Sequence, residues 1–265
     1  MSKVFAGVTV AAAFALVAFN LWGLHGPGVW AKMTASTGFI CVAVSVGAHR
    51  WTYGRIMLAG LFLSWWGDWF LTRSGDTGFL LGLVSFLSAH VMYCIAFGVR
   101  GIRWQWSLAA LPVVAAVTGG VLMWISPHVS ADMIWPVRVY TTVISIMVIL
   151  SVGAMGASEV VIFFVLPYSS ADTWFVRAYG TVTTIMRTLS VGVKGPNGPL
   201  GIPIGAVLFY LSDISVATGQ FHVTDFPNYI WGLPFYFIGQ VCLAFSAARL
   251  TAAEAPGAAA VPARG

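Results

Sequence analysis

One acidic residue, Asp68, stands within an apolar stretch that runs from about residue 54 to residue 72. An ionised carboxylate is costly to bury in hydrocarbon, so an acid inside a membrane segment points to a function. On a helix, Gly60 and Ser64 would share one face with Asp68, and Gly67 would lie beside them. Such a small and polar face favours the interior of a helix bundle over contact with lipid.

A second acid repeats this pattern far downstream. Asp213 follows Ser212 at the end of an apolar segment that begins with Gly205 and Ala206. Any fold and function for this chain must therefore accommodate two carboxylates, each preceded by small residues in an apolar segment.

The composition identifies the class of protein. Hydrophobic residues make up 59% of the 265 residues and charged residues 8%, whereas about 25% of an ordinary soluble chain is charged. Mean hydropathy is +0.88. A membrane-crossing helix needs about 20 apolar residues, and the continuous apolar runs exclude the alternating pattern of a transmembrane β-barrel. The sequence predicts an all-α, polytopic transmembrane helix bundle with eight core helices at about 4–24, 31–49, 54–72, 78–99, 106–126, 135–154, 201–220 and 229–249.

The basic residues indicate how these helices cross the membrane, because cytoplasmic loops carry an excess of Lys and Arg. If the N-terminus is cytoplasmic, most of the basic residues between helices fall on the inner side: Arg50, Arg55, Arg100, Arg103, Arg249 and Arg264. The outer side then holds Lys32, Arg73 and Arg138. We predict an integral protein of a bacterial plasma membrane with both termini inside, and the net charge of +5 reflects topology rather than nucleic-acid binding.

This orientation places the intramembrane polar groups at one depth. At ~1.5 Å per residue, Asp68 would lie ~6 Å and Asp213 ~9 Å from the outer ends of their helices. Lys32 would begin the second helix on the outer side. Polar faces at a similar level occur in the fourth and last helices, at Gly82, Phe86, His90, Tyr93 and Phe97, and at Gly232, Tyr236 and Gln240. We expect these groups to meet in the outer half of the bilayer.

A tandem duplication separates the sixth and seventh apolar segments. Residues 130–153, which include Tyr140, recur with one residue deleted as residues 170–192, which include Tyr179. The duplicated region near 155–200 is expected to add to the eight-helix core and to cross the membrane an even number of times.

The domain organisation follows from these segments. Residues 1–250 are predicted to form one transmembrane helical domain. Residues 251–265 are rich in Ala, Pro and Gly without periodicity, which predicts a disordered C-terminal tail.

Four blocks of residues carry a resemblance to a known family. They are Leu61–Leu71 with its Gly-Asp pair, then Gly82, Phe86, His90 and Tyr93, then Tyr140, Ile144 and Met147, and finally Gly205–Asp213, with a weaker match at Tyr236 and Gln240. Together they resemble the lysoplasmalogenases, eight-helix membrane proteins that include the bacterial YhhN-like group. Two features depart from the family: Met33 follows Lys32 where a Lys-Pro pair is usual, and either Tyr140 or Tyr179 could fill the family's tyrosine position.

The resemblance implies hydrolysis of the vinyl ether of alkenyl lysophospholipids to a fatty aldehyde and a glycerophospho-base. Such an ether is cleaved by protonating its β-carbon, after which water adds to the cation. A carboxylic acid and a carboxylate can divide this work, as they do in glycosidases. We predict Asp68 and Asp213 as catalytic, a lysophospholipid and membrane lipid as partners, and neither metal nor cofactor. The predicted binding residues are Lys32, Ser64, His90, Tyr93, Tyr140, Ser212, Tyr236 and Gln240.

Other interpretations use the same residues. A proton-linked transporter or lipid-handling protein could employ both carboxylates as a relay, although no pair of Gly/Pro-broken helices occurs in corresponding halves of the chain. Structural roles are the simplest alternative. Asp68 could hydrogen-bond across the bundle, His90 could be a packed core histidine, and Lys32 could extend toward the membrane interface.

Overall fold

The computed structural model describes residues 1–73, 75–155 and 201–248. Every regular element in these ranges is helical. The elements are α1 (Ser2–Leu21), α2 (His25–Ser45), η1 (Ala48–Arg50), α3 (Thr52–Phe70), α4 (Asp76–Arg100), α5 (Trp104–Ile125), η2 (Ser126–His128), α6 (Ile134–Gly153), α9 (Gly201–Gln220) and α10 (Tyr229–Ser246). The second copy of the repeat and the tail at 251–265 lie outside the described residues, and so do the predictions made for them.

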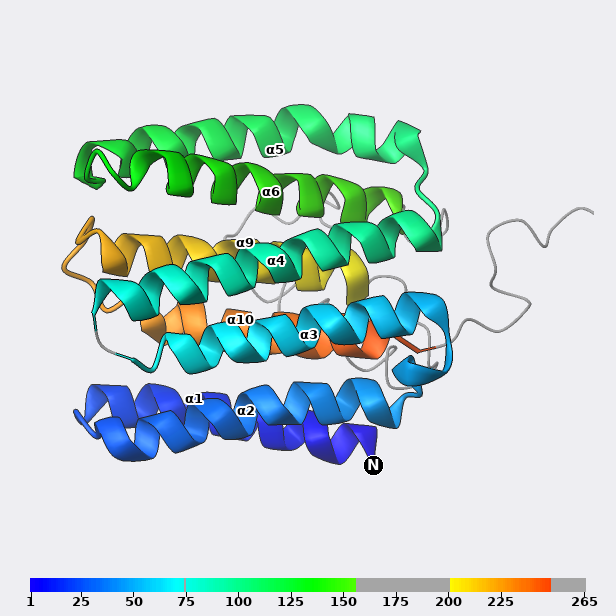
Figure 1. Cartoon of the computed structure of the whole chain (residues 1–265), viewed down its shortest axis with the longest axis horizontal. Coiled ribbons are helices and arrows are strands. Elements are labelled where there is room, and N and C mark those ends of the chain that lie inside the picture. The colour runs from blue at the N-terminus through cyan, green and yellow to red at the C-terminus, as the bar shows by residue number, and fades with distance from the viewer. Residues whose placement is uncertain (74, 156–200, 249–265) are drawn as a thin grey trace, which may run out of the picture.

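The eight described α-helices run side by side as an antiparallel bundle (Figure 1). α1 packs on α2, α3 on α4 and α9 on α10. The end of α6 and the start of α9 lie at the same end of the bundle as the N-terminus (Figure 1). At this N-terminal end, the Tyr53 hydroxyl lies 3.1 Å from Ser246 Oγ. The predicted polytopic bundle with eight core helices is confirmed.

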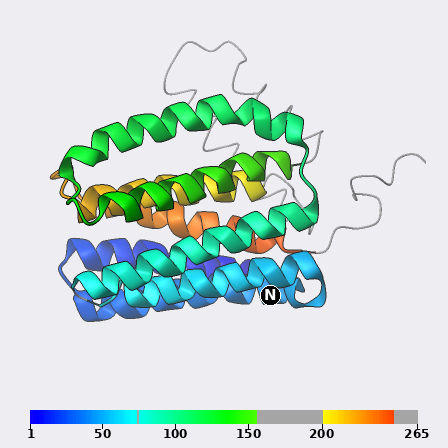
Figure 2. The same ribbon diagram turned by 45° about the horizontal axis from the view of Figure 1, so that its top comes forward.

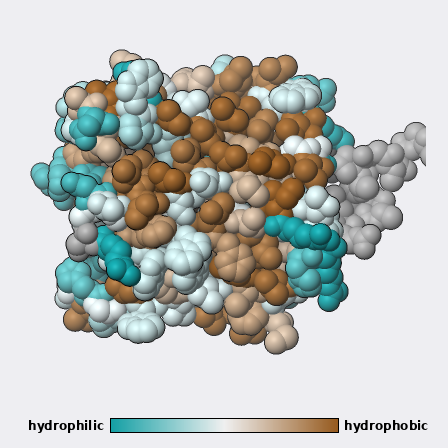
Figure 3. Space-filling model, in the orientation of Figure 1, coloured by the Kyte–Doolittle hydropathy of each residue, from teal (hydrophilic) through white to brown (hydrophobic). Residues whose placement is uncertain are grey.

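Six of the described helices are long and apolar enough to cross a membrane: α1, α4, α5 with η2, α6, α9 and α10. Apolar side chains cover the middle of the face in Figure 3, and most hydrophilic residues lie toward its two ends. α2 and α3 fall outside this apolar set, and they carry Lys32 and Asp68. The chain is therefore an integral membrane protein, and its less apolar helices carry part of its polar interior.

The start of α2 corrects a sequence prediction. The helix begins at His25 rather than near residue 31, because Pro27 lies in the first turn, where backbone N–H groups have no intrahelical acceptor. Lys32 consequently stands seven residues into α2, or ~10 Å from its start. It does not begin the helix, and it lies deep enough to approach the other polar residues of the interior.

Close contact between α9 and α10 positions two of the polar faces. A Cβ atom on Gly239 would lie 3.0 Å from the carbonyl oxygen of Gly205, so only glycine lets these backbones approach to this distance. This contact sets Asp213 on α9 beside the α10 face that holds Tyr236 and Gln240, both of which are buried.

Candidate active site

A cavity of about 670 Å³ lies at the end of the bundle opposite the N-terminus, within the usual size range of small-molecule sites. Both predicted catalytic residues, Asp68 and Asp213, line it. Its walls come from α5, α6, α9, α10, the ends of α2, α3 and α4, and the α9–α10 connection, and most of the lining side chains are apolar. Two carboxyl groups from distant segments therefore face one largely apolar space.

Asp68 lies in the last turn of α3 and is surrounded by hydrogen-bond donors. Its Oδ2 accepts hydrogen bonds from Ser36 Oγ at 2.7 Å and from the Tyr236 hydroxyl at 2.6 Å. Its Oδ1 lies 3.8 Å from Lys32 Nζ. The Asp68 side chain is only 2% exposed, so this carboxylate is held by three donors from α2 and α10.

Aromatic packing keeps Asp68 in this position. Gly67 allows the ring of Phe86 to approach α3, since a Cβ atom at Gly67 would lie 2.7 Å from that ring. Phe86 in turn packs edge-on against Phe209 and Tyr236, with ring centroids 5.9 and 5.8 Å away. The hydroxyl of Tyr236 is thereby aimed at Asp68 from a rigid cluster.

Asp213 has fewer partners. Its Oδ2 accepts a hydrogen bond from the Tyr140 hydroxyl at 2.8 Å. The Nε2 atom of His90 lies 3.6 Å from the same oxygen, and neither ring nitrogen of His90 has a hydrogen-bond partner among the described residues. The Asp213 side chain is 14% exposed, so it is more open to the cavity than Asp68 is.

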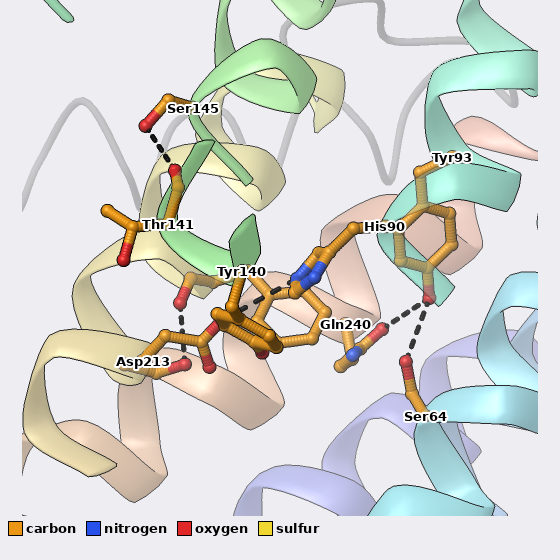
Figure 4. Close-up of polar contacts among 10 residues, drawn as sticks. Ser64, His90, Tyr93, Tyr140, Thr141, Ser145, Asp213 and Gln240 are labelled. Carbon is orange, nitrogen blue, oxygen red and sulfur yellow. Dashed lines mark hydrogen bonds and ion pairs between the residues drawn. The ribbon is translucent and has the colours of Figure 1, made fainter. Parts of the chain in front are cut away.

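A separate polar network lies on the other side of His90 (Figure 4). The Tyr93 hydroxyl donates to Gln240 Oε1 at 2.9 Å and lies 3.3 Å from Ser64 Oγ. All three side chains are buried, and the amide nitrogen of Gln240 has no partner among the described residues. This network connects α3, α4 and α10 but does not line the cavity.

The predicted site residues therefore fall into three groups. Six line the cavity: Lys32, Asp68, Tyr140, Ser212, Asp213 and Tyr236. His90 stands beside Asp213, whereas Ser64, Tyr93 and Gln240 form the network described above. The hydroxyl of Ser212 donates to the Phe209 carbonyl oxygen, so its hydrogen is not offered to the cavity.

The hydrogen bond of Ser36 to Asp68 was not predicted from the sequence. Ser36 donates to Asp68, and its spacing of four residues from Lys32 places both on one face of α2. That spacing was a usable signal. Within the described ranges, no group of three or more His, Cys, Asp and Glu side chains is placed to hold a metal ion. The polar side chains that line the cavity carry an ammonium, hydroxyls, two amides and two carboxyls.

The comparisons with known proteins agree with this architecture. Two curated relatives, both named lysoplasmalogenase, come from Mycobacterium bovis and Mycobacterium tuberculosis. Each is 30% identical over 127 residues, which span 46% of this chain and 47% of the relative; the match thus covers about half the length of these relatives. No solved structure matches the chain. The model of the YhhN family matches residues 29–160 and 148–247, so the chain belongs to the YhhN family, as the resemblance in its sequence predicted.

Proposed function

We propose that this protein is a membrane lysoplasmalogenase-like hydrolase that cleaves the vinyl ether of alkenyl lysophospholipids. The observation that carries the proposal is the pair of unlike carboxyl groups in one apolar cavity. Asp68 is surrounded by donors, as suits a carboxylate, whereas Asp213 accepts one hydrogen bond and faces the open space. An acid and a carboxylate in one site are what vinyl-ether hydrolysis requires.

The substrate matches the distribution of polarity in the cavity. A lysophospholipid combines one phosphodiester with one hydrocarbon chain. Lys32 is the one cationic residue among the described residues that line the cavity. Its ammonium has three N–H donors and lies 3.8 Å from Asp68 Oδ1, so it has donors left for a second anionic group. We assign Lys32 to the phosphodiester, and the apolar walls to the chain.

In the first chemical step, Asp213 donates its proton to the β-carbon of the vinyl ether. The π electrons form the new C–H bond and leave an oxocarbenium ion, which the Asp68 carboxylate stabilises across the cavity. Tyr140, bonded to Asp213 Oδ2, orients the acid and then donates to the carboxylate that remains. This division of labour resembles that of the two carboxyl groups in glycosidases.

Water then adds to the cationic carbon and returns a proton to Asp213, which gives a hemiacetal. The hemiacetal collapses when the bond from this carbon to the glycerol oxygen breaks. Its hydroxyl loses a proton and the glycerol oxygen gains one, so the step is neutral overall. Asp213, which lines the cavity and lies 3.6 Å from the ring of His90, is suited to carry that proton. The products are the aldehyde and the glycerophospho-base.

We also propose that both termini are cytoplasmic and that the cavity opens on the outer side. Among the described residues, the N-terminal end of the bundle carries Lys3, Arg50, Arg55, Arg100 and Arg103 and no Asp or Glu, whereas the opposite end combines Arg73 and Arg138 with Asp76, Asp132 and Asp225. The positive-inside rule then sets the orientation. A cysteine at Arg103 should resist an impermeant maleimide added to intact cells, and a cysteine at Asp225 should react; the reverse pattern would invert the topology.

The test of function uses the purified full chain in nanodiscs with an alkenyl lysophospholipid and no ion gradient. Aldehyde release is expected, and the matched saturated 1-alkyl lysophospholipid should release none, because its β-carbon has no double bond that can accept a proton. Absence of aldehyde from a folded protein would refute the hydrolase. Gradient-dependent movement of the intact lipid would instead support the transporter or lipid-handling alternative.

A further inference from the structure

The cavity has an opening on its side that the chemistry above does not use. α6 forms the floor of the cavity through Val137, Tyr140, Thr141 and Ile144, which recur at the spacing of one helix face. α5 contributes Val121, Leu122 and Ile125, and α9 contributes Val216 and its neighbours. α6 packs against both α5 and α9, so the cavity forms a groove with α6 as its floor and the other two helices as its rims.

The two rims meet near Tyr210, which precedes Asp213 by three residues on α9 and therefore lies slightly farther from the outer end of the bundle. Thr118 Oγ1 on α5 lies 3.2 Å from the Tyr210 hydroxyl on α9 and 2.7 Å from Ser145 Oγ on α6. Between Thr118 and the end of α5, Val121, Leu122 and Ile125 line the cavity. In Figure 2, α5 arches away from α6 and α9 over its middle and approaches them again at its two ends.

The groove reaches the outer surface of the bundle. Val216 lines the cavity and is nevertheless 42% exposed. On the α5 side of the groove, apolar residues such as Val113 and Val117 face outward. An apolar opening bordered by lipid-facing residues leads into the hydrocarbon of the bilayer rather than into water.

We propose that the hydrocarbon chain of the substrate enters and leaves sideways between α5 and α9, with Val121, Leu122 and Val216 as the rims of this portal. The inference rests on the proposed function and names the route its substrate takes. Asp213 is three residues, ~4–5 Å, from Tyr210 along α9, and the Thr118–Tyr210 contact closes the groove there. A long chain whose vinyl ether lies at Asp213 therefore has no room to extend deeper and passes out between the rims.

Narrowing the portal tests this route. Val121→Trp and Val216→Trp should each lower the ratio of kcat/KM for a hexadecenyl lysolipid to that for a butenyl lysolipid by about tenfold or more, the scale of steric discrimination in apolar pockets. Val113→Trp is the matched control, because Val113 is on α5, is 65% exposed and lies on the far side of Thr118 from the cavity. Its ratio should equal that of the unmodified protein. The corresponding Phe variants make the same comparison with a smaller insertion if a Trp variant does not fold.

The results separate the portal from the chemistry. An unchanged ratio in both portal variants, or an equal change in the control, would overturn the portal. If the unmodified protein releases no aldehyde from either lipid, the proposed function fails, and the portal is then measured with the saturated 1-hexadecyl lysophospholipid as a binding probe. Weaker binding to Val121→Trp than to Val113→Trp would support the lateral route, and equal binding would refute it.

Discussion

The two sides of the cavity are built differently. On the side of α2, α3 and α10, Asp68 is almost fully enclosed, and hydroxyl and ammonium groups occupy the space around both of its oxygens. On the side of α5, α6 and α9, Asp213 accepts a hydrogen bond from Tyr140 and faces open volume. α5 is the most exposed of the six helices that could cross the membrane, because only 11% of its apolar 18-residue stretch is buried.

This difference suggests a separation of tasks. A carboxylate that accepts two hydrogen bonds and pairs with an ammonium is held in one place, which suits electrostatic stabilisation of a cation. A carboxyl group with a free oxygen beside a cavity can exchange a proton with a substrate. The enclosed side would therefore hold charge, and the open side would perform proton transfer and admit lipid.

The largest expected effect is on catalysis at the open side. Asp213→Asn keeps the shape of the side chain and an acceptor for the Tyr140 hydroxyl, but it removes the proton that is to be donated. Aldehyde release should fall about 10²–10⁴-fold, the usual scale for a lost general acid. The melting temperature in detergent should stay close to that of the unmodified protein. Undiminished turnover would remove Asp213 from the mechanism.

The next effect is on stability at the enclosed side. Asp68→Asn leaves the Lys32 ammonium without a counter-charge, and breaking a fully buried ion pair costs about 3–5 kcal/mol. Lys32 borders the cavity and is 15% exposed, so we expect a loss of about 2–3 kcal/mol in the free energy of unfolding.

The double variant Asp68→Asn with Lys32→Met is the control for this stability effect. It should recover most of the lost stability, because no unpaired charge remains. Denaturant titration in detergent measures both proteins. Equal stability of Asp68→Asn and the unmodified protein would show that the enclosed carboxylate is not held as an ion pair.

Much of the site could be predicted from the sequence because an acid in an apolar helix is so unfavourable. Asp68 and Asp213 stood out for that reason, and the spacing on α10 placed Tyr236 on an inward face. The hydrogen bond between Tyr236 and Asp68, 168 residues apart, depends on how helices pack, which spacing along one helix does not reveal. The same limit applies to Ser64, Tyr93 and Gln240, which share faces with site residues yet bond to one another.

Other features escaped prediction for local reasons. Gly26-Pro27-Gly28 is typical of a loop, and the tolerance of a first helical turn for proline gave α2 an earlier start. The repeat left both Tyr140 and Tyr179 as candidates for the family's tyrosine position, and the contact of Tyr140 with Asp213 favours the first copy. The role of each binding residue stays a prediction.

A smaller effect would test that choice between the repeats. Tyr140→Phe removes the hydrogen bond to Asp213 and retains the ring, so kcat should fall about tenfold, which corresponds to ~1.4 kcal/mol. Tyr179→Phe is the matched change in the second copy and should leave kcat unaltered. Steady-state assays measure kcat for the two variants. A larger loss of kcat in Tyr179→Phe would assign the family's tyrosine position to Tyr179 instead of Tyr140.

The last prediction compares backbone packing on the two sides. Gly119 on α5 has nothing within 4 Å of where a Cβ atom would stand, so Gly119→Ala adds helix propensity without a clash. It should raise the free energy of unfolding by about 0.5–1 kcal/mol. At Gly67, on the enclosed side, a Cβ atom would press on the Phe86 ring, and Gly67→Ala should lower stability by about 1–3 kcal/mol, as overpacking does. Stability changes of opposite sign in the two variants, measured by thermal melting, would establish that α5 is loosely packed where α3 is tightly packed. A destabilised Gly119→Ala would mean that α5 is already packed at this position. That result would weaken the case for a groove that opens beside it.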